Sequence, residues 1–193
     1  MSKTICVYCA SSSRVDSLYF EAATRLGTLI AQKRMTLVTG GGNQGLMRAV
    51  EDGALESGGK AIGVIPRFMV DCGWQHTGLT ELRITADMHE RKKTMAGLAD
   101  AVIALPGGCG TMEELMEIIT WKQLGLYLNP IVILNTGGYY TPLIRQLEHA
   151  VETNFMGEIH SRIWSVATTP AEAIEIIRNT PRWNESVRKY AAL

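Results

Sequence analysis

Glu113 and Glu114 are the residues of this sequence best placed to do chemistry, because they closely follow a glycine-rich turn, Pro106-Gly107-Gly108-Cys109-Gly110. An apolar run of strand length, residues 101–105, precedes the turn, and a helical pattern begins at Thr111. A buried strand that enters a helix in this way leaves backbone N–H groups free at the positive end of the helix dipole, which suits a phosphate or another anion. Two carboxylates would repel a phosphate bound beside them. They therefore either only cap the helix, or carry out acid–base or cation-stabilising chemistry next to the anion.

The capping alternative is specific for Glu114. Residues 111–114 match a capping box, in which Thr111 caps the helix and Glu114, three residues later, reaches back to its backbone amide. A capping box needs only an acceptor oxygen, whereas catalysis needs the carboxylate itself. The local pattern leaves both roles open.

Arg91 is the second residue that could do chemistry. On a helix expected over residues 86–99, it shares one stripe with Met88, Met95 and Leu98. Its guanidinium therefore starts from the apolar face, where it needs an anionic partner. The partner can be a carboxylate such as Glu114 in a structural ion pair, the stem can extend to the surface, or the group can be functional.

A glycine triplet forms the third notable motif. Residues 40–45, Gly-Gly-Gly-Asn-Gln-Gly, match G-x-G-x-x-G between an expected strand and an expected helix. Dinucleotide-binding proteins place this motif after the first strand, with an acidic residue about 20 positions later. Here the motif follows the second strand, and the third strand ends without an acidic residue. A tight turn that lets helix and sheet pack closely is the structural interpretation; a nicotinamide-dependent oxidoreductase is kept as an alternative function.

The elements that must position these motifs alternate along the chain. Strands are expected at residues 4–9, 35–39, 61–65, 81–84, 101–105, 131–134 and 163–167, and helices at 16–33, 45–57, 86–99, from 111 onward, at 139–154 and at 170–179. Residues 67–80 are interpreted as a long irregular loop or lid, and 181–193 as a tail. The alternation predicts an α/β fold, a three-layer arrangement of a mainly parallel sheet with helices on both faces. Ligands of such sheets bind beyond the carboxyl ends of the strands, where the turns at 11–13, 40–45 and 107–111 fall.

Composition limits the function classes. The 193 residues suit a single domain, 1–193, and 46% hydrophobic with 20% charged residues is typical of globular proteins. A formal net charge of zero argues against nucleic acid or an anionic membrane as partner, and no apolar run reaches the length of a membrane span. Four cysteines without paired spacing favour a reducing, cytoplasmic location. No metal is expected, since no His/Cys/Asp cluster has ligand spacing.

The motifs together resemble a known family. Met88-His89-Glu90-Arg91-Lys92 followed by residues 106–114, which read PGGxGTxxE, is similar to the LOG family of cytokinin riboside 5'-monophosphate phosphoribohydrolases. The resemblance covers roughly residues 4–180 and includes the stretches 40–47, 119–125 and 135–140. Proteins with this motif are sometimes labelled lysine decarboxylase-like, although nothing here marks a pyridoxal-phosphate lysine. The resemblance implies a Rossmann-like fold, a homodimer, no cofactor, and hydrolysis of the N-glycosidic bond of nucleoside 5'-monophosphates.

The resemblance also implies site residues. It makes Arg91 and Glu114 the catalytic pair, with Arg91 clamping phosphate, orienting Glu114 or assisting departure of the base. The expected substrate-binding residues are those that match the family's nucleotide-binding positions or lie in the turns at the strand ends: Ser11, Gly42, Gly45, Met88, Lys92, Gly107, Gly108, Cys109, Gly110, Thr111, Met112, Glu113 and Thr120. The main alternative is a nucleotide or molybdenum-cofactor carrier of the same fold that hydrolyses nothing.

Two further expectations concern the base and the assembly. Phe68, Met69, Val70 and Trp74 either line a pocket for an apolar N6 substituent or simply pack. The run Trp121–Leu128 ends a helix that is already apolar on its inner stripe, which leaves Trp121, Leu126 or Tyr127 exposed in a monomer. Such a patch favours a two-fold dimer packed through this helix.

Overall fold

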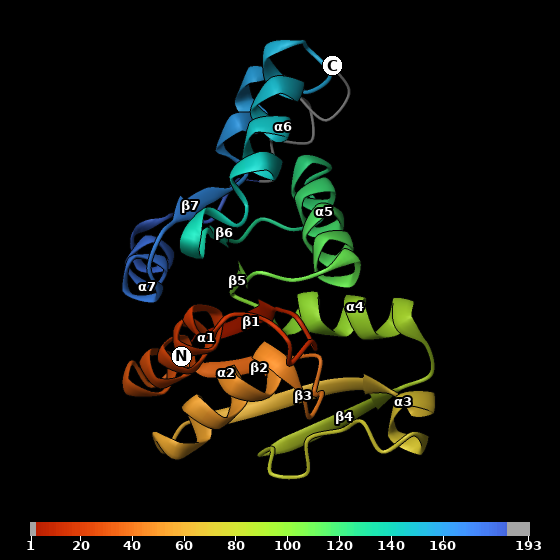
Figure 1. The fold of residues 1–193 in the computed structure, drawn as a ribbon. Helices are drawn as coiled ribbons and strands as arrows, with labels where there is room; N and C mark the ends of the chain where they lie inside the picture. The colour runs from red at the N-terminus through yellow and green to blue at the C-terminus, as the bar shows by residue number, and fades with distance from the viewer. Residues whose placement is uncertain (1–2, 185–193) are drawn as a thin grey trace.

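A sheet of seven parallel strands forms the centre of the computed structural model, which describes residues 3–184 (Figure 1). The strands are β1 (Thr4–Tyr8), β2 (Thr36–Thr39), β3 (Lys60–Pro66), β4 (Glu81–Thr85), β5 (Ala101–Ala104), β6 (Ile131–Leu134) and β7 (Ser165–Ala167). Their order is β4-β3-β2-β1-β5-β6-β7, so the direction of strand addition reverses between β1 and β5. The predicted α/β class and parallel sheet are confirmed, and a crevice for a ligand is expected where the order reverses.

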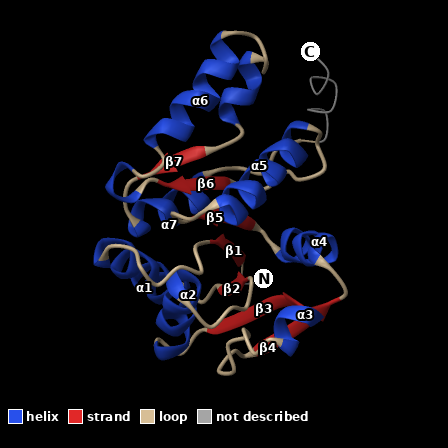
Figure 2. Cartoon of the chain, turned by 45° about the vertical axis from the view of Figure 1, so that its right-hand side comes forward, coloured by secondary structure: helices blue, strands red, loops and turns tan. Residues whose placement is uncertain are grey.

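Three helices cover each face of the sheet (Figures 1 and 2). One face carries α1 (Ser17–Gln32), α2 (Gly45–Glu56) and α7 (Pro170–Asn179); the other carries α4 (Met88–Leu98), α5 (Cys109–Gln123) and α6 (Thr141–Glu152). The central strands β5 and β6 are apolar throughout because both of their faces are buried, whereas the edge strand β4 includes Glu81 and Arg83. In β1, Ile5 and Val7 pack in one core while Cys6 and Tyr8 pack in the other.

Side-chain caps determine where several helices begin. Asp16 accepts a hydrogen bond from the Leu18 N–H and starts α1, close to the predicted boundary. Asp87 accepts from the Glu90 N–H, so α4 begins at Met88, two residues later than predicted. A short polar side chain at this position satisfies an N–H group that has no acceptor within the helix.

The prediction of an irregular segment over residues 67–80 is wrong for its first turn. A short helix, α3 (Arg67–Asp71), follows Pro66 directly at the end of β3. The rest of the segment is irregular but is tied to the glycine turn, because the Asn43 N–H donates to the Trp74 carbonyl at 2.8 Å and the His76 N–H to the Gly41 carbonyl at 2.9 Å. These backbone bonds join the segment to the end of β2.

The C-terminal third differs from the prediction at its boundaries. The 3-10 helix η1 (Thr136–Gly138) precedes α6, which begins at Thr141 and not at residue 139, while η2 (Glu158–Arg162) precedes a β7 of three residues. Of the predicted tail, residues 181–184 are described: the Trp183 N–H donates to the Leu128 carbonyl, and its ring lies 4.8 Å from Lys122 Nζ. Residues 185–193 lie outside the described part. Within residues 3–184, no helix is long and apolar enough to cross a membrane.

Candidate active site

A cavity of about 600 Å³ lies at the carboxyl ends of β1, β2 and β5, where the strand order reverses. All three predicted turns contribute to its wall, through Ser11 and Ser12, Gly40 and Gly42, and residues 108–111. The parallel strands bring these turns together because every carboxyl end faces the same edge of the sheet.

The cavity wall contains most of the predicted site residues. Ten of them line it: Ser11, Gly42, Met88, Arg91, Gly108, Cys109, Gly110, Thr111, Glu113 and Glu114. The other five lie outside its wall: Gly45, Lys92, Gly107, Met112 and Thr120.

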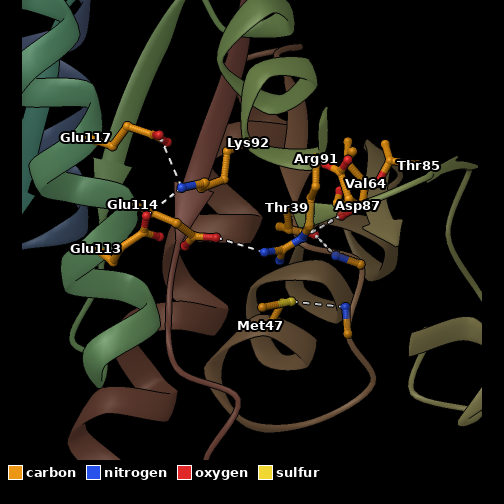
Figure 3. A network of polar contacts seen from close by, with 12 residues as sticks. Thr39, Met47, Val64, Thr85, Asp87, Arg91, Lys92, Glu113, Glu114 and Glu117 are labelled. Atoms are coloured by element: carbon orange, nitrogen blue, oxygen red, sulfur yellow. Dashed lines mark hydrogen bonds and ion pairs between the residues drawn. The ribbon is translucent and has the colours of Figure 1, made fainter. Parts of the chain in front are cut away.

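Arg91 and Glu114 form a buried ion pair at the cavity wall (Figure 3). Arg91 is 6% exposed and Glu114 8%. Arg91 Nη1 donates to Glu114 Oε1 at 2.9 Å, and its Nε donates to the Val64 carbonyl at 2.9 Å. The guanidinium is therefore held from two sides, by the end of β3 and by the carboxylate on α5.

The protonation of Glu114 reflects two opposing effects. Burial raises the pKa of this carboxyl, and the Arg91 guanidinium opposes the shift without cancelling it. The nearby Glu113 carboxylate adds to the rise. A carboxyl with a raised pKa beside a cation suits a group that must act on a developing charge or a proton near neutral pH.

The capping alternative for Glu114 does not hold. Helix α5 begins at Cys109 with Gly108 as its N-cap, so Thr111 lies inside the first turn and Glu114 near the start of the second. The first intrahelical bond runs from the Met112 N–H to the Gly108 carbonyl at 3.0 Å. The side chain of Glu114 is directed to Arg91 instead of the helix start.

The start of α5 is arranged to bind an anion. The N–H groups of Cys109, Gly110 and Thr111 belong to the first helical turn, where no acceptor exists within the helix. All three residues line the cavity, so the positive end of the helix dipole adjoins it.

Two tyrosines that the sequence did not mark as functional bind the backbone of the glycine-rich turn and of the residue just before it. The Tyr139 hydroxyl donates to the Gly107 carbonyl at 2.7 Å, and the Tyr140 hydroxyl donates to the Leu105 carbonyl at 2.7 Å. The segment that follows η1 is thereby hydrogen-bonded to the chain just before α5. The only signal in the sequence was the similarity of residues 135–140 to the LOG family, which assigned these tyrosines no role.

Lys92 points away from Arg91 although the two are adjacent (Figure 3). Its Nζ donates to Glu113 Oε1 at 2.5 Å and to Glu117 Oε1 at 3.1 Å, which links α4 to α5. Partial burial of Lys92 lowers its pKa, but the two carboxylates outweigh this effect and the net shift is upward. Lys92 therefore stays a cation and joins the two helices that carry Arg91 and Glu114.

Close contacts explain the predicted glycine turn. A side chain at Gly40 would place its Cβ 1.8 Å from Arg91 Nη2, and one at Gly45 would lie 2.4 Å from the backbone carbon of Ser11. Gly45 also has φ +63°, a conformation that favours glycine. These glycines let the turn approach Arg91 and the Ser11 backbone, which supports the structural interpretation of the motif.

Another part of the cavity wall is apolar. It is formed by Met47, Ile65, Met69, Trp74 and Met88, of which Trp74 is 50% exposed. Of the four residues considered for a base pocket, Met69 and Trp74 line the cavity, whereas Phe68 and Val70 do not. An anion site, a carboxylate and an apolar wall thus share one cavity, which could hold a molecule with a phosphate at one end and a flat apolar group at the other.

Among the residues the structure describes, no group of three His, Cys, Asp or Glu side chains could hold a metal ion.

Comparisons with known proteins agree in family and fold. The family model described as possible lysine decarboxylase matches residues 47–177. The chain is 40% identical over 188 residues to the cytokinin riboside 5'-monophosphate phosphoribohydrolase LOG7 of Arabidopsis thaliana, covering 97% of this chain and 87% of that protein. It is 44% identical over 155 residues to the cytokinin riboside 5'-monophosphate phosphoribohydrolase of Rhodococcoides fascians, covering 80% and 78% of the two chains.

Solved structures share the architecture at lower identity. The molybdenum cofactor binding protein from the phototrophic bacterium Rippkaea orientalis matches with a TM-score of 0.70 and 24% identity, over 92% of this chain and 96% of that one. At this identity the likeness shows the fold alone.

Proposed function

The chain belongs to the LOG family, and from this premise we propose that it hydrolyses the N-glycosidic bond of nucleoside 5'-monophosphates to a free base and ribose 5-phosphate. The observation that carries the proposal is the Arg91–Glu114 pair in the wall of a cavity that also contains the start of α5. Relatives named as cytokinin riboside 5'-monophosphate phosphoribohydrolases make AMP and N6-substituted AMP the first substrates to test.

The geometry supports one orientation of the substrate. The 5'-phosphate binds at the N–H groups of Cys109, Gly110 and Thr111. The base lies against the apolar wall, where the half-exposed ring of Trp74 offers a surface for stacking. The ribose then lies between the two, beside the Glu114 carboxylate.

Glu114 supplies the chemistry in this orientation. Cleavage of the bond between the anomeric carbon and the base nitrogen develops positive charge on the ribose, which a carboxylate stabilises. Water adds its oxygen to the anomeric carbon and loses a proton, and the departing base gains one, so the products are base and ribose 5-phosphate. Arg91 orients the carboxylate through the 2.9 Å bond and favours its ionised form.

Product analysis tests the proposal directly. The purified protein is incubated with AMP, CMP, GMP and isopentenyladenosine monophosphate, and the free base is separated by chromatography. We expect release of the base from at least one purine monophosphate and none from the corresponding nucleoside, which lacks the phosphate. Tight binding of a monophosphate without any release of base would contradict the proposal and favour a carrier.

We also propose that the protein is a homodimer in a reducing compartment. Leu126 is 65% exposed, and Leu124 and Met116 on the same helix region are also exposed, which supports an interface there. Tyr127 was predicted as a possible member of this patch, but it is buried and its hydroxyl contacts the Ala99 carbonyl, so it does not belong to the patch. All four cysteines are free, which is usual for proteins of the cytosol.

A further inference from the structure

We propose that Thr39 and Glu51 are positioning residues for the proposed reaction, because they hold the Gly40–Gly42 turn against the Arg91 guanidinium. This inference rests on the proposed function. Neither residue lines the cavity, and the resemblance to the LOG family assigned no role to either.

Glu51 is a carboxyl in an unusual place. It lies in the middle of α2 and is 0% exposed, and the other buried side chains of this helix, such as Leu46, Val50 and Ala54, are apolar. Its Oε1 is hydrogen-bonded to the Thr39 hydroxyl, and its Oε2 is buried with no hydrogen-bond partner among the described residues. A buried carboxyl with one unsatisfied oxygen destabilises a fold, and an apolar side chain would avoid that penalty.

The charged groups around Glu51 do not neutralise it by contact. The neighbouring Asp52 is a carboxylate, and it is paired with Arg48 at 3.1 Å and with His76 at 2.9 Å. The thiol of Cys9, which follows β1, is another titratable group near Glu51. The Thr39 hydroxyl is therefore the contact through which Glu51 acts.

Thr39 transmits this contact to the turn. It is 0% exposed at the end of β2, and its Oγ1 accepts a hydrogen bond from the Gly41 N–H at 3.1 Å. Gly41 has φ +69°, so the turn reverses direction at the residue that Thr39 holds. A second bond, from the Gly42 N–H to Met47 Sδ at 3.0 Å, ties the following residue to α2 (Figure 3).

The turn in turn limits the position of Arg91. The turn approaches the guanidinium at Gly40, where an added Cβ would lie 1.8 Å from Arg91 Nη2 and 3.0 Å from Arg91 Cζ. The guanidinium is thus confined between the Gly40 backbone, the Val64 carbonyl and Glu114. Loss of the Thr39 bond would let the turn move and would loosen the guanidinium that orients Glu114. Small displacements of a catalytic pair lower turnover strongly.

Two pairs of variants test this inference. Thr39→Val and Glu51→Ala break the hydrogen-bonded chain, whereas Thr39→Ser and Glu51→Gln keep a group that can hydrogen-bond at the same position. We expect kcat to fall about tenfold in the first pair, with a smaller change in KM, and to stay within about threefold of the parent in the second pair. The two disrupting changes lie on different elements, so one remains informative if the other does not fold.

A readout independent of turnover separates this inference from the proposed function. The Arg91 Nε–H is bonded to the Val64 carbonyl and should give a protected side-chain signal in a ¹⁵N NMR spectrum. We expect Thr39→Val and Glu51→Ala to shift or broaden this signal and the conservative pair to retain it. If the parent released no base, the proposed function would be wrong. The NMR comparison would still test whether Thr39 and Glu51 position Arg91. An unchanged Arg91 signal and unchanged kcat in all four variants, even with lower melting temperatures, would reduce Thr39 and Glu51 to a structural role.

Discussion

The Glu114 carboxyl shows how position in the fold decides the role of a residue. Its place after a glycine turn is compatible with a helix cap, but one of its oxygens is bonded to Arg91 and its side chain lies at the cavity wall. The helix begins before Thr111, so the cap that would have competed for this oxygen does not form. The carboxylate is therefore held by Arg91 at the cavity wall, where it can act on a bound molecule.

Glu114→Gln tests the role of this carboxylate. The amide keeps the shape of the side chain and can still accept a hydrogen bond from Arg91, so the variant should fold and bind nucleotide, with a lower melting temperature because the buried Arg91 loses its anionic partner. A neutral group cannot stabilise the positive charge on the ribose, and we expect kcat to fall about 100-fold or more. Release of base from AMP or its N6-substituted form measures kcat.

Glu117→Gln is the matched control for this change. Glu117 lies one turn further along α5, shares Lys92 with Glu113, and does not line the cavity. Its substitution removes the same charge from the same helix. A loss of turnover similar to that of Glu114→Gln would attribute the effect to the charge of α5 and contradict a specific role for Glu114.

The titration of Glu51 should appear in the pH dependence of stability. Burial is the main cause that raises the pKa of Glu51 from 4.5 to about 8; the bond to Thr39 opposes the rise, Asp52 adds to it and Arg48 opposes it. Between pH 4.5 and 8 the unfolded chain has lost this proton while the folded chain keeps it, so the free energy of unfolding falls as pH rises. Above about pH 8 both states have lost the proton and this contribution is constant.

Glu51→Gln removes this titration and isolates it from other groups. We expect the stability of the variant relative to the parent to increase from pH 5 to pH 8, because the parent alone loses stability over that range. Urea unfolding at several pH values measures the difference. A difference that is constant with pH would show that the pKa of Glu51 is not raised in the folded protein.

At the scale of elements, two helices approach each other closely through glycines. A Cβ at Gly27 of α1 would lie 2.0 Å from the Val50 carbonyl oxygen, and one at Gly53 of α2 would lie 2.3 Å from the Thr24 carbonyl oxygen. Both obstacles are backbone atoms, which cannot turn aside as a flexible side chain could. The close packing fixes α2, which carries Glu51, against α1.

Gly27→Ala should therefore destabilise the protein although alanine favours helix. The added methyl group requires α1 and α2 to separate, and we expect a loss of about 2 kcal/mol in the free energy of unfolding. The control is Gly97→Ala on α4, where the added Cβ meets nothing within 4 Å. There the higher helix propensity of alanine should stabilise by about 0.5–1 kcal/mol. Chemical denaturation of both variants measures the change in the free energy of unfolding. Equal changes in Gly27→Ala and Gly97→Ala would contradict the packing argument.

At the scale of the whole molecule, the proposed dimer can be tested through the exposed patch at the end of α5. We expect the parent to have twice the chain mass of 21.2 kDa at micromolar concentration in light scattering. Leu126→Asp places a charge on the patch and should shift the protein to the monomer, because burial of an unpaired charge is unfavourable.

Phe155→Asp is the control for the dimer, since Phe155 is also exposed but lies beyond the end of α6. The mass of this variant should equal that of the parent. A monomeric parent, or a Leu126→Asp variant that keeps the mass of the parent, would contradict an interface at this patch.

The sequence by itself determined the architecture and the general location of the site. Strand-length apolar runs alternate with helical patterns, and such strands pair in parallel because each connection returns the chain to the same end of the sheet. That rule brings the turns at residues 11–13, 40–45 and 107–111 together, and the cavity is found there. These properties depend on local periodicity, which is readable from the residue order.

Only the tertiary structure decided the partners of the polar side chains. Arg91 and Glu114 come from different helices, and the packing of α4 against α5 turns Arg91 to the cavity while Lys92 turns to Glu113 and Glu117. The same holds for the hydroxyl of Tyr127, which contacts the Ala99 carbonyl of a distant segment, and for the bond between Glu51 and Thr39. A side chain's direction on its helix follows from spacing, but what lies opposite depends on how whole elements pack together.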